Sequence, residues 1–141
     1  MTSLRLPHLV LIATSLLPTS LSAQVDLRVR ADAPGRDESN LNGEWVMVSN
    51  NGTVPLDVSR WRLCNALAAC YTLPDSTAIA PGGDLRIRTG AGRDNLRELH
   101  MGRGRPMWQN WADVATLRDP TGEIRARCMW DRGRGVDCTS T

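Results

Sequence analysis

Short runs in which apolar and polar residues alternate constrain this chain more than any other feature. In "VDLRVR" the side chains of Val25, Leu27 and Val29 fall on one face and the polar side chains fall on the other. A repeat of two residues is that of a strand with one buried face. The segment therefore predicts a half-buried strand at the start of the folded part.

The same alternation returns along the chain, and glycine and proline interrupt it. "EWVMV" and "DLRIR" each predict a strand, and "ADVATLRDPTGEIRARCMW" predicts two strands joined by a "DPTG" turn. Only "GRDNLRELH", residues 92–100, has the composition for a turn or two of helix. Short strands at roughly regular spacing predict an all-β sandwich. The predicted core and structural residues are Trp45, Val46, Val48, Trp61, Leu63, Leu85, Ile87 and Leu117.

The strand "EWVMV" is unusual because both of its faces are apolar. Val46 and Val48 share one face, and Trp45 and Met47 share the other. Such a strand is either covered on both sides or presents Trp45 and Met47 to a partner. Glu44, at its entrance, is expected to be a structural hydrogen bonder, because acid catalysis needs a second group at a defined separation.

The first 23 residues have the pattern of a secretory signal peptide. Arg5 precedes an apolar run, Leu9 to Leu17, and "LSA" ends in a small residue before Gln24, although Leu21 is larger than expected for its position. Cleavage is expected before Gln24, with Ser22 as a competing site. A retained membrane anchor is the alternative, but the run is about half of the ~20 residues that span a bilayer. We expect a secreted, periplasmic or cell-surface protein.

Four cysteines, Cys64, Cys70, Cys128 and Cys138, follow this leader, and an even number in an exported chain predicts disulfides. Three pairings are possible. We favour Cys64–Cys70 and Cys128–Cys138, because each pair brackets a short turn-like segment. A zinc site is the alternative, but the C-x₂-C spacing is missing.

Charge and motifs argue against several functional classes. The chain has 17 basic residues against 15 acidic ones, so no strong field towards nucleic acid or membrane is implied. No G-x-S-x-G motif is present, and His100 is the single histidine after the leader, expected on a loop or at the surface. We therefore predict no enzyme activity, no catalytic residue and no cofactor.

A loop rich in oxygen ligands, "DAPGRDESN", raises the alternative of a calcium site. Asp32, Asp37, Glu38 and Asn40 lie within it. Their spacing is not that of an EF-hand, and backbone capping in turns explains the same residues. We predict no metal.

Arginine and tryptophan supply the candidate binding residues. "HMGRGRPMWQNW" interleaves two arginines with two tryptophans, and arginine on phosphate beside an aromatic platform is typical of single-strand or phosphate binding. Arginines also recur two residues apart on four predicted strands, as 28/30, 60/62, 86/88 and 125/127, which would place each pair outside the core. If such strands were neighbours, the pairs would form one stripe. A core role for Trp108 and an ordinary charged outer face are the alternatives. The candidate binding residues are Arg86, Arg88, Arg103, Arg105, Trp108 and Trp111.

Several motifs in sequence order resemble the lamin tail domain, and more closely its bacterial exported form. They are "ADAPGRDESNLNGEWVMVSN", "PLDVSRWRL", "YTLPDSTAIAPGGDLRIRTG", "MGRGRPMWQN" and "DVATLRDPTGEI". The resemblance implies an immunoglobulin-like β-sandwich in which Trp61 is a core anchor. Cys64, Cys70 and the tail after residue 130 depart from the family pattern.

We expect three segments in the chain: a signal peptide over residues 1–23, a lamin-tail-like domain over 24–130, and a tail over 131–141 that a disulfide ties back.

The resemblance implies little about function beyond binding. The expected role is a binding module that docks an unknown protein or cell-surface polymer. The alternative is binding of DNA or other nucleic acid through an arginine-rich sheet face, and fold analogy alone does not decide between them.

Overall fold

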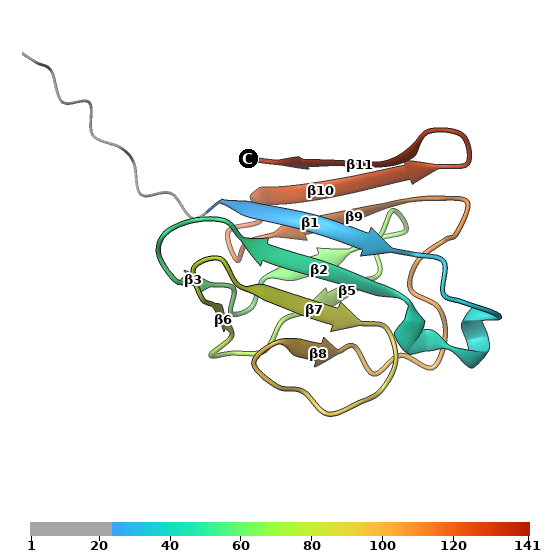
Figure 1. Ribbon diagram of the computed structural model, residues 1–141, viewed down its shortest axis with the longest axis horizontal. Coiled ribbons are helices and arrows are strands. Elements are labelled where there is room, and N and C mark those ends of the chain that lie inside the picture. Colours follow the sequence, from blue (N-terminus) through green and yellow to red (C-terminus); the bar gives the residue numbers. More distant parts are fainter. Residues whose placement is uncertain (1–23) are drawn as a thin grey trace, which may run out of the picture.

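The computed structural model describes residues 24–141, which form two packed β-sheets and almost no helix (Figure 1). One sheet has four strands in the order β1-β2-β7-β8, and the other has five in the order β11-β10-β9-β4-β5. A two-stranded ribbon, β3-β6, lies beside them. The predicted all-β sandwich is confirmed. The predicted signal peptide, residues 1–23, lies outside the described residues.

The elements have these bounds. The four-stranded sheet contains β1 (Val25–Arg30), β2 (Trp45–Asn50), β7 (Asp84–Arg88) and β8 (Glu98–His100). The five-stranded sheet contains β4 (Arg62–Cys64), β5 (Cys70–Thr72), β9 (Ala112–Arg118), β10 (Ile124–Asp131) and β11 (Gly135–Ser140). The ribbon is β3 (Leu56–Asp57) and β6 (Ala78–Ile79), and two short 3-10 helices span Asp37–Ser39 and Leu41–Gly43.

The core lies between the two sheets, where the alternating apolar residues meet. Across the four-stranded sheet, Leu27 pairs with Val48 and Val48 pairs with Leu85, so one row of inward side chains crosses three strands. From the five-stranded sheet, Leu63 and Leu117 face them and are fully buried. Burial of these side chains is the main stabilising contribution, at about 1.5–3 kcal/mol each.

Trp45 is the predicted core residue that the structure does not bury completely. Val46, Val48, Trp61, Leu63, Leu85, Ile87 and Leu117 are buried. Trp45 points to the outer face of β2 and stays partly exposed, because the period of two turns it away from Val46. Its neighbour on that face, Met47, is only 9 % exposed. The sequence left two alternatives for this strand: cover on both faces, or an outer face open to a partner. The strand is central in its sheet, and its outer face is covered at Met47 and partly open at Trp45.

Glu44 is a fully buried carboxylate at the entrance to β2. Its Oε2 accepts a hydrogen bond from the backbone N–H of Met107 at 3.0 Å. Burial raises the pKa of Glu44 above its ordinary value. The residue therefore ties the 101–107 loop to the start of the strand, which is the structural role expected of it.

The helix expected over residues 92–100 is wrong. Residues 91–97 form an exposed loop, and Glu98–His100 form β8, which pairs in parallel with β7. The loop is a short crossover held by tertiary contacts, since Asn42 accepts the N–H of Gly90 at 2.8 Å and donates to the carbonyl of Ala91 at 2.8 Å. Local helical propensity yields here to strand pairing with β7.

Both expected disulfides are present, Cys64–Cys70 and Cys128–Cys138. The first clips the β4–β5 hairpin, and the second joins β10 to β11. The tail after residue 130 is thus not a loose extension, because it supplies β11 as the outermost strand of its sheet (Figure 1). No helix among residues 24–141 is long and apolar enough to cross a membrane.

Candidate functional site

The outer face of the four-stranded sheet gathers four arginines around two apolar side chains. The strand register explains the grouping: Arg30 and Arg88 lie opposite Trp45 from the two sides, and Arg28 and Arg86 lie opposite Met47 in the same way. We call this set the arginine–tryptophan face. It consists of Arg28, Arg30, Trp45, Met47, Arg86 and Arg88.

Direct contacts join the guanidinium groups to the central strand. The guanidinium carbon of Arg86 lies 5.1 Å from the centre of the Trp45 ring, which is cation–π distance. Arg28 Nη2 lies 3.1 Å from the sulfur of Met47. The apolar parts of these arginines cover β2, and their charged ends remain at the surface.

Ion pairing on this face is unequal. Arg88 pairs with Glu98 at 3.0 Å, and Arg28 reaches Asp84 only at 4.0 Å. Arg30 and Arg86 form no ion pair with any residue of the described part of the chain. Two guanidinium groups on either side of the Trp45 indole are thus available to an anionic group.

The other two arginine pairs do not extend this face into one stripe. Arg60 sits in a turn with φ of 61° and pairs with Asp75 at 2.8 Å, so it does not share a strand face with Arg62. Arg125 lies at a β-bulge between Ile124 and Ala126, which turns it over the buried ring of Trp61 at 5.4 Å. Both pairs belong to the five-stranded sheet or its turns. The pairs Arg28/Arg30 on β1 and Arg86/Arg88 on β7 are not on neighbouring strands either, because β2 lies between them.

The structure separates the six candidate binding residues. Arg86 and Arg88 belong to the arginine–tryptophan face, whereas Trp108 is 2 % exposed and packs edge-on against Trp130 at 5.9 Å. Trp108 is therefore a core residue and not a stacking platform for a ligand. The remaining three candidates, Arg103, Arg105 and Trp111, lie in or next to the loops between β8 and β9.

Trp111 is exposed, at 61 %, and the guanidinium carbon of Arg132 lies 3.9 Å from the centre of its ring. Arg105 is exposed as well, while Arg103 is half-buried and donates its backbone N–H to the carbonyl of Thr89 at 3.0 Å. The basic and aromatic residues of this loop therefore have different roles. Trp108 packs in the core, the backbone of Arg103 supports the loop, and Arg105 and Trp111 lie at the surface.

His100 differs from the expected loop or surface histidine. It lies in β8 with a side chain only 8 % exposed, Nδ1 lies 3.2 Å from Asp94 Oδ1, and Nε2 lies 3.5 Å from Glu98 Oε1. The backbone of Gly92 covers the ring so closely that a Cβ there would lie 2.2 Å from Nε2. Among residues 24–141, no hydroxyl or thiol hydrogen-bonds to His100, so the arrangement holds the 91–97 loop and contains no nucleophile.

The acidic loop considered for calcium instead makes turn and loop contacts. Asp37 Oδ1 accepts the N–H of Ala33 at 3.2 Å, and its Oδ2 accepts from Asn110 at 2.6 Å. Asn40 donates to the carbonyl of Pro34 at 3.1 Å. In the described part of the chain, no group of three or more acidic, histidine or cysteine side chains is placed to hold a metal ion.

Sequence reasoning missed the role of β2 as the centre of the arginine–tryptophan face. Its doubly apolar pattern was the available signal, since Trp45 and Met47 on one face required either cover or a partner. The carboxylates beside His100 carried no such signal, because the crossover loop and parallel pairing that bring Asp94 and Glu98 to it are tertiary features.

Comparison with known protein families places the chain in a family. The model of the Lamin Tail Domain family matches residues 22–132, which is most of the chain and includes every strand except β11. No curated protein matches the chain.

Proposed function

The chain belongs to the lamin tail domain family, and from that premise we propose that it is an exported interaction module. The family is an immunoglobulin-like, non-catalytic one, which supports binding over chemistry. Two disulfides and a signal-like leader support an oxidising compartment outside the cytosol.

The docking surface in this proposal is the arginine–tryptophan face, and its ligand is an acidic patch of a protein or an acidic surface polymer. The observation that carries the proposal is Trp45 between Arg30 and Arg86, two arginines without carboxylate partners in the described chain. Tryptophan and arginine are the residues that most often dominate interface energetics. The outer face of a sheet suits another folded surface better than a small molecule, which is usually bound in a concave site.

Binding by the full exported chain to culture fluid and envelope fractions of its source cell tests the proposal. The variant Arg30→Glu/Arg86→Glu is expected to lose the captured partner. Arg36→Glu/Arg62→Glu is the matched control, because both arginines are exposed, neither forms an ion pair in the described chain, and the charge change is equal. If both variants capture the partner equally well, the arginine–tryptophan face is not the docking surface.

Nucleic acid is the second candidate ligand, and the four guanidinium groups on one sheet face favour it. Phosphate contacts by the two guanidinium groups without ion pairs in the described chain, those of Arg30 and Arg86, predict a slope of log affinity against log salt of about −1.8 for duplex DNA. Asp26, Asp84 and Glu98 on the same face oppose a phosphate backbone, which is why the acidic protein or polymer is preferred. Absence of DNA binding at low salt would end this second candidate.

A further inference from the structure

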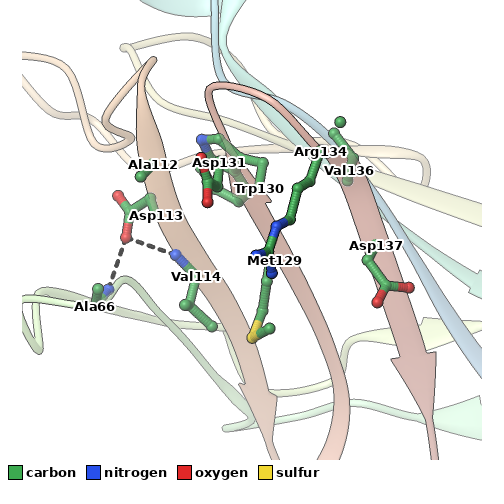
Figure 2. Close-up of a pocket in the computed structure, with 11 residues that line it drawn as sticks. Ala66, Ala112, Asp113, Val114, Met129, Trp130, Asp131, Arg134, Val136 and Asp137 are labelled. Atoms are coloured by element: carbon green, nitrogen blue, oxygen red, sulfur yellow. Dashed lines mark hydrogen bonds between the residues drawn. The ribbon is translucent and has the colours of Figure 1, made fainter.

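A second groove lies on the five-stranded sheet, and it adjoins the arginine–tryptophan face only at one edge, where Arg30 and Asp131 line the same pocket. Its cavity has a volume of about 710 Å³, and Figure 2 shows the residues around it. Val114 on β9 and Met129 on β10 are cross-strand partners and form its floor. Met129 is 48 % exposed, a high value for a methionine in the middle of a sheet. We call this the hairpin groove.

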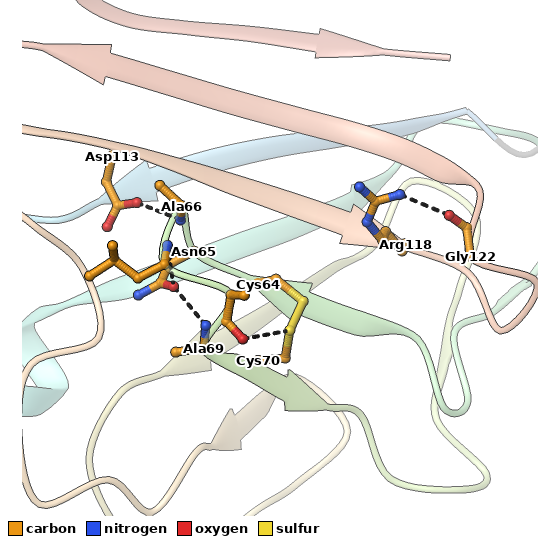
Figure 3. The surroundings of a disulfide bond; sticks show 10 residues. Cys64, Asn65, Ala66, Ala69, Cys70, Asp113, Arg118 and Gly122 are labelled. Atoms are coloured by element: carbon orange, nitrogen blue, oxygen red, sulfur yellow. Dashed lines mark hydrogen bonds between the residues drawn. A yellow bond between two sulfur atoms is a disulfide. The ribbon is translucent and has the colours of Figure 1, made fainter.

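A disulfide-clipped hairpin forms each side of the hairpin groove. On one side is Ala66, at the tip of the hairpin that Cys64–Cys70 closes (Figure 3). On the other side is the β10–β11 hairpin, which Cys128–Cys138 closes. Covalently fixed walls lower the ordering cost of binding, so the groove is a preorganised surface.

Asp113 fixes the first wall to the floor. Its Oδ1 accepts the N–H of Ala66 at 2.8 Å and the N–H of Val114 at 2.8 Å, and its Oδ2 accepts the N–H of Gln109 at 3.0 Å. This carboxylate is thus occupied by the protein itself. It shapes the groove and is not available to a ligand.

The two carboxylates at the second wall are available. Asp137 lies directly across from Met129 on β11, and Asp131 lies two residues beyond Met129 on the same face of β10. Neither side chain forms an ion pair or a hydrogen bond with any residue in 24–141. Arg134 is the one cation lining the groove, and it reaches from the turn toward Met129 (Figure 2). The hairpin groove is thus apolar at its floor, and its second wall carries two carboxylates, unpaired among residues 24–141, against one guanidinium, so that rim is net acidic.

We propose that the hairpin groove docks an extended peptide segment of a partner protein in which an apolar side chain adjoins a lysine or arginine. The apolar side chain rests on Val114 and Met129, and the cation lies between Asp131 and Asp137. The pliant thioether of methionine adapts to different apolar side chains. This ligand is opposite in charge to the one expected at the arginine–tryptophan face, so the domain would present two surfaces of different specificity.

Methionine methyl signals of the exported chain, labelled isotopically and observed by NMR, test this directly. The probe is the blocked peptide acetyl-Gly-Ser-Leu-Arg-Gly-Ser-amide, and its two controls replace Arg by Glu or Leu by Gly. Met129 reports on the groove, Met107 is the buried internal control at 3 % exposure, and Met47 reports on the opposite face.

A saturable shift of the Met129 signal with the Leu-Arg peptide, weaker with either control peptide, is the expected result. Asp131→Asn/Asp137→Asn should weaken it about fivefold, as two exposed ion pairs allow. Glu38→Gln/Glu123→Gln, which removes two exposed carboxylates elsewhere, should leave it unchanged.

Three outcomes would overturn the proposal. One is a Met129 signal that does not move at saturating peptide while the Met47 signal does. Another is an equal shift with the Leu-Glu peptide or with the Asp131→Asn/Asp137→Asn variant. The third is a Met129 signal that depends on protein concentration without peptide, which would make a second copy of the chain the occupant. The test does not depend on the arginine–tryptophan face, so its failure leaves that proposal standing.

Discussion

Asp113 on β9 holds the backbone N–H of Ala66 at 2.8 Å and thereby fixes the tip of the β4–β5 hairpin to a strand that follows it by more than forty residues (Figure 3). The same carboxylate accepts two further N–H groups, from Val114 and Gln109. Asp113→Ala would leave these three donors without their acceptor at a part-buried site, where the carboxylate itself is 5 % exposed. We expect a loss of about 3 kcal/mol in the free energy of unfolding, measured by urea denaturation.

The matched variant for this prediction is Asp113→Asn, which keeps one carbonyl oxygen as acceptor. It should lose less stability than Asp113→Ala. If the two variants lose the same amount, the hydrogen bonds of the carboxylate are not what fixes the hairpin tip.

Removal of the two disulfides should have different effects on stability and on local amide exchange. In the chain-entropy treatment, their short loops predict a loss of about 2 kcal/mol for Cys64→Ala/Cys70→Ala and about 3 kcal/mol for Cys128→Ala/Cys138→Ala. All six residues of β11 are exposed, so little apolar burial holds that strand when the second disulfide is removed. Amide exchange should therefore accelerate over β11 in the second variant and stay slow in β9. Retention of slow exchange over residues 135–140 would contradict this.

The elements that could be predicted are those that carry their own pattern. β1, β7, β9 and β10 alternate along the sequence, and burial of one face is enough to fix such strands, while β2 is recognisable as a short apolar run with two apolar faces. β11 has no such pattern in "GVDCTS" and exists as a strand through its pairing with β10 and the Cys128–Cys138 bond. β8 was mistaken for helix because its three residues gain their conformation from parallel pairing with β7.

The candidate site was only partly accessible to sequence reasoning. The period of two placed Arg86 and Arg88 on an outer face, but strand order decides which arginines meet, and strand order is a long-range property. Trp108 and Trp111 are three residues apart in one loop, and tertiary packing buries the first and exposes the second. Nothing in their local sequence distinguishes them.

Truncation of single tryptophan side chains should distinguish a core role from a role in binding at the outer face. Trp61 is 5 % exposed and belongs to the core, so Trp61→Ala is expected to cost about 3–5 kcal/mol of unfolding free energy. Trp45 is partly exposed, so Trp45→Ala should cost roughly half as much and abolish partner capture. Urea unfolding and the capture assay measure the two effects. Equal destabilisation by both variants would mean that Trp45 serves the core and not the surface.

The buried carboxyl of Glu44 makes stability depend on pH. Burial raises its pKa in the folded state above the ordinary value of 4.5, so the folded protein holds this proton to higher pH than the unfolded chain does. The free energy of unfolding should therefore fall as pH rises from about 4.5 through the raised pKa. Glu44→Gln keeps an oxygen for the N–H of Met107 but has no charge to bury, so this contribution to the pH dependence should disappear.

Urea midpoints of the two proteins at pH 4 and pH 8 measure the effect. Relative to the wild type, Glu44→Gln should gain stability between the lower and the higher pH, because only the wild type must bury an ionised group as the carboxyl titrates. Glu123→Gln is the matched control, since Glu123 is exposed and forms no ion pair in the described chain. A pH dependence that Glu123→Gln shared with Glu44→Gln would not be specific to the buried site. A Glu44→Gln difference that is independent of pH would show that the folded state does not hold the proton of Glu44 beyond its ordinary range.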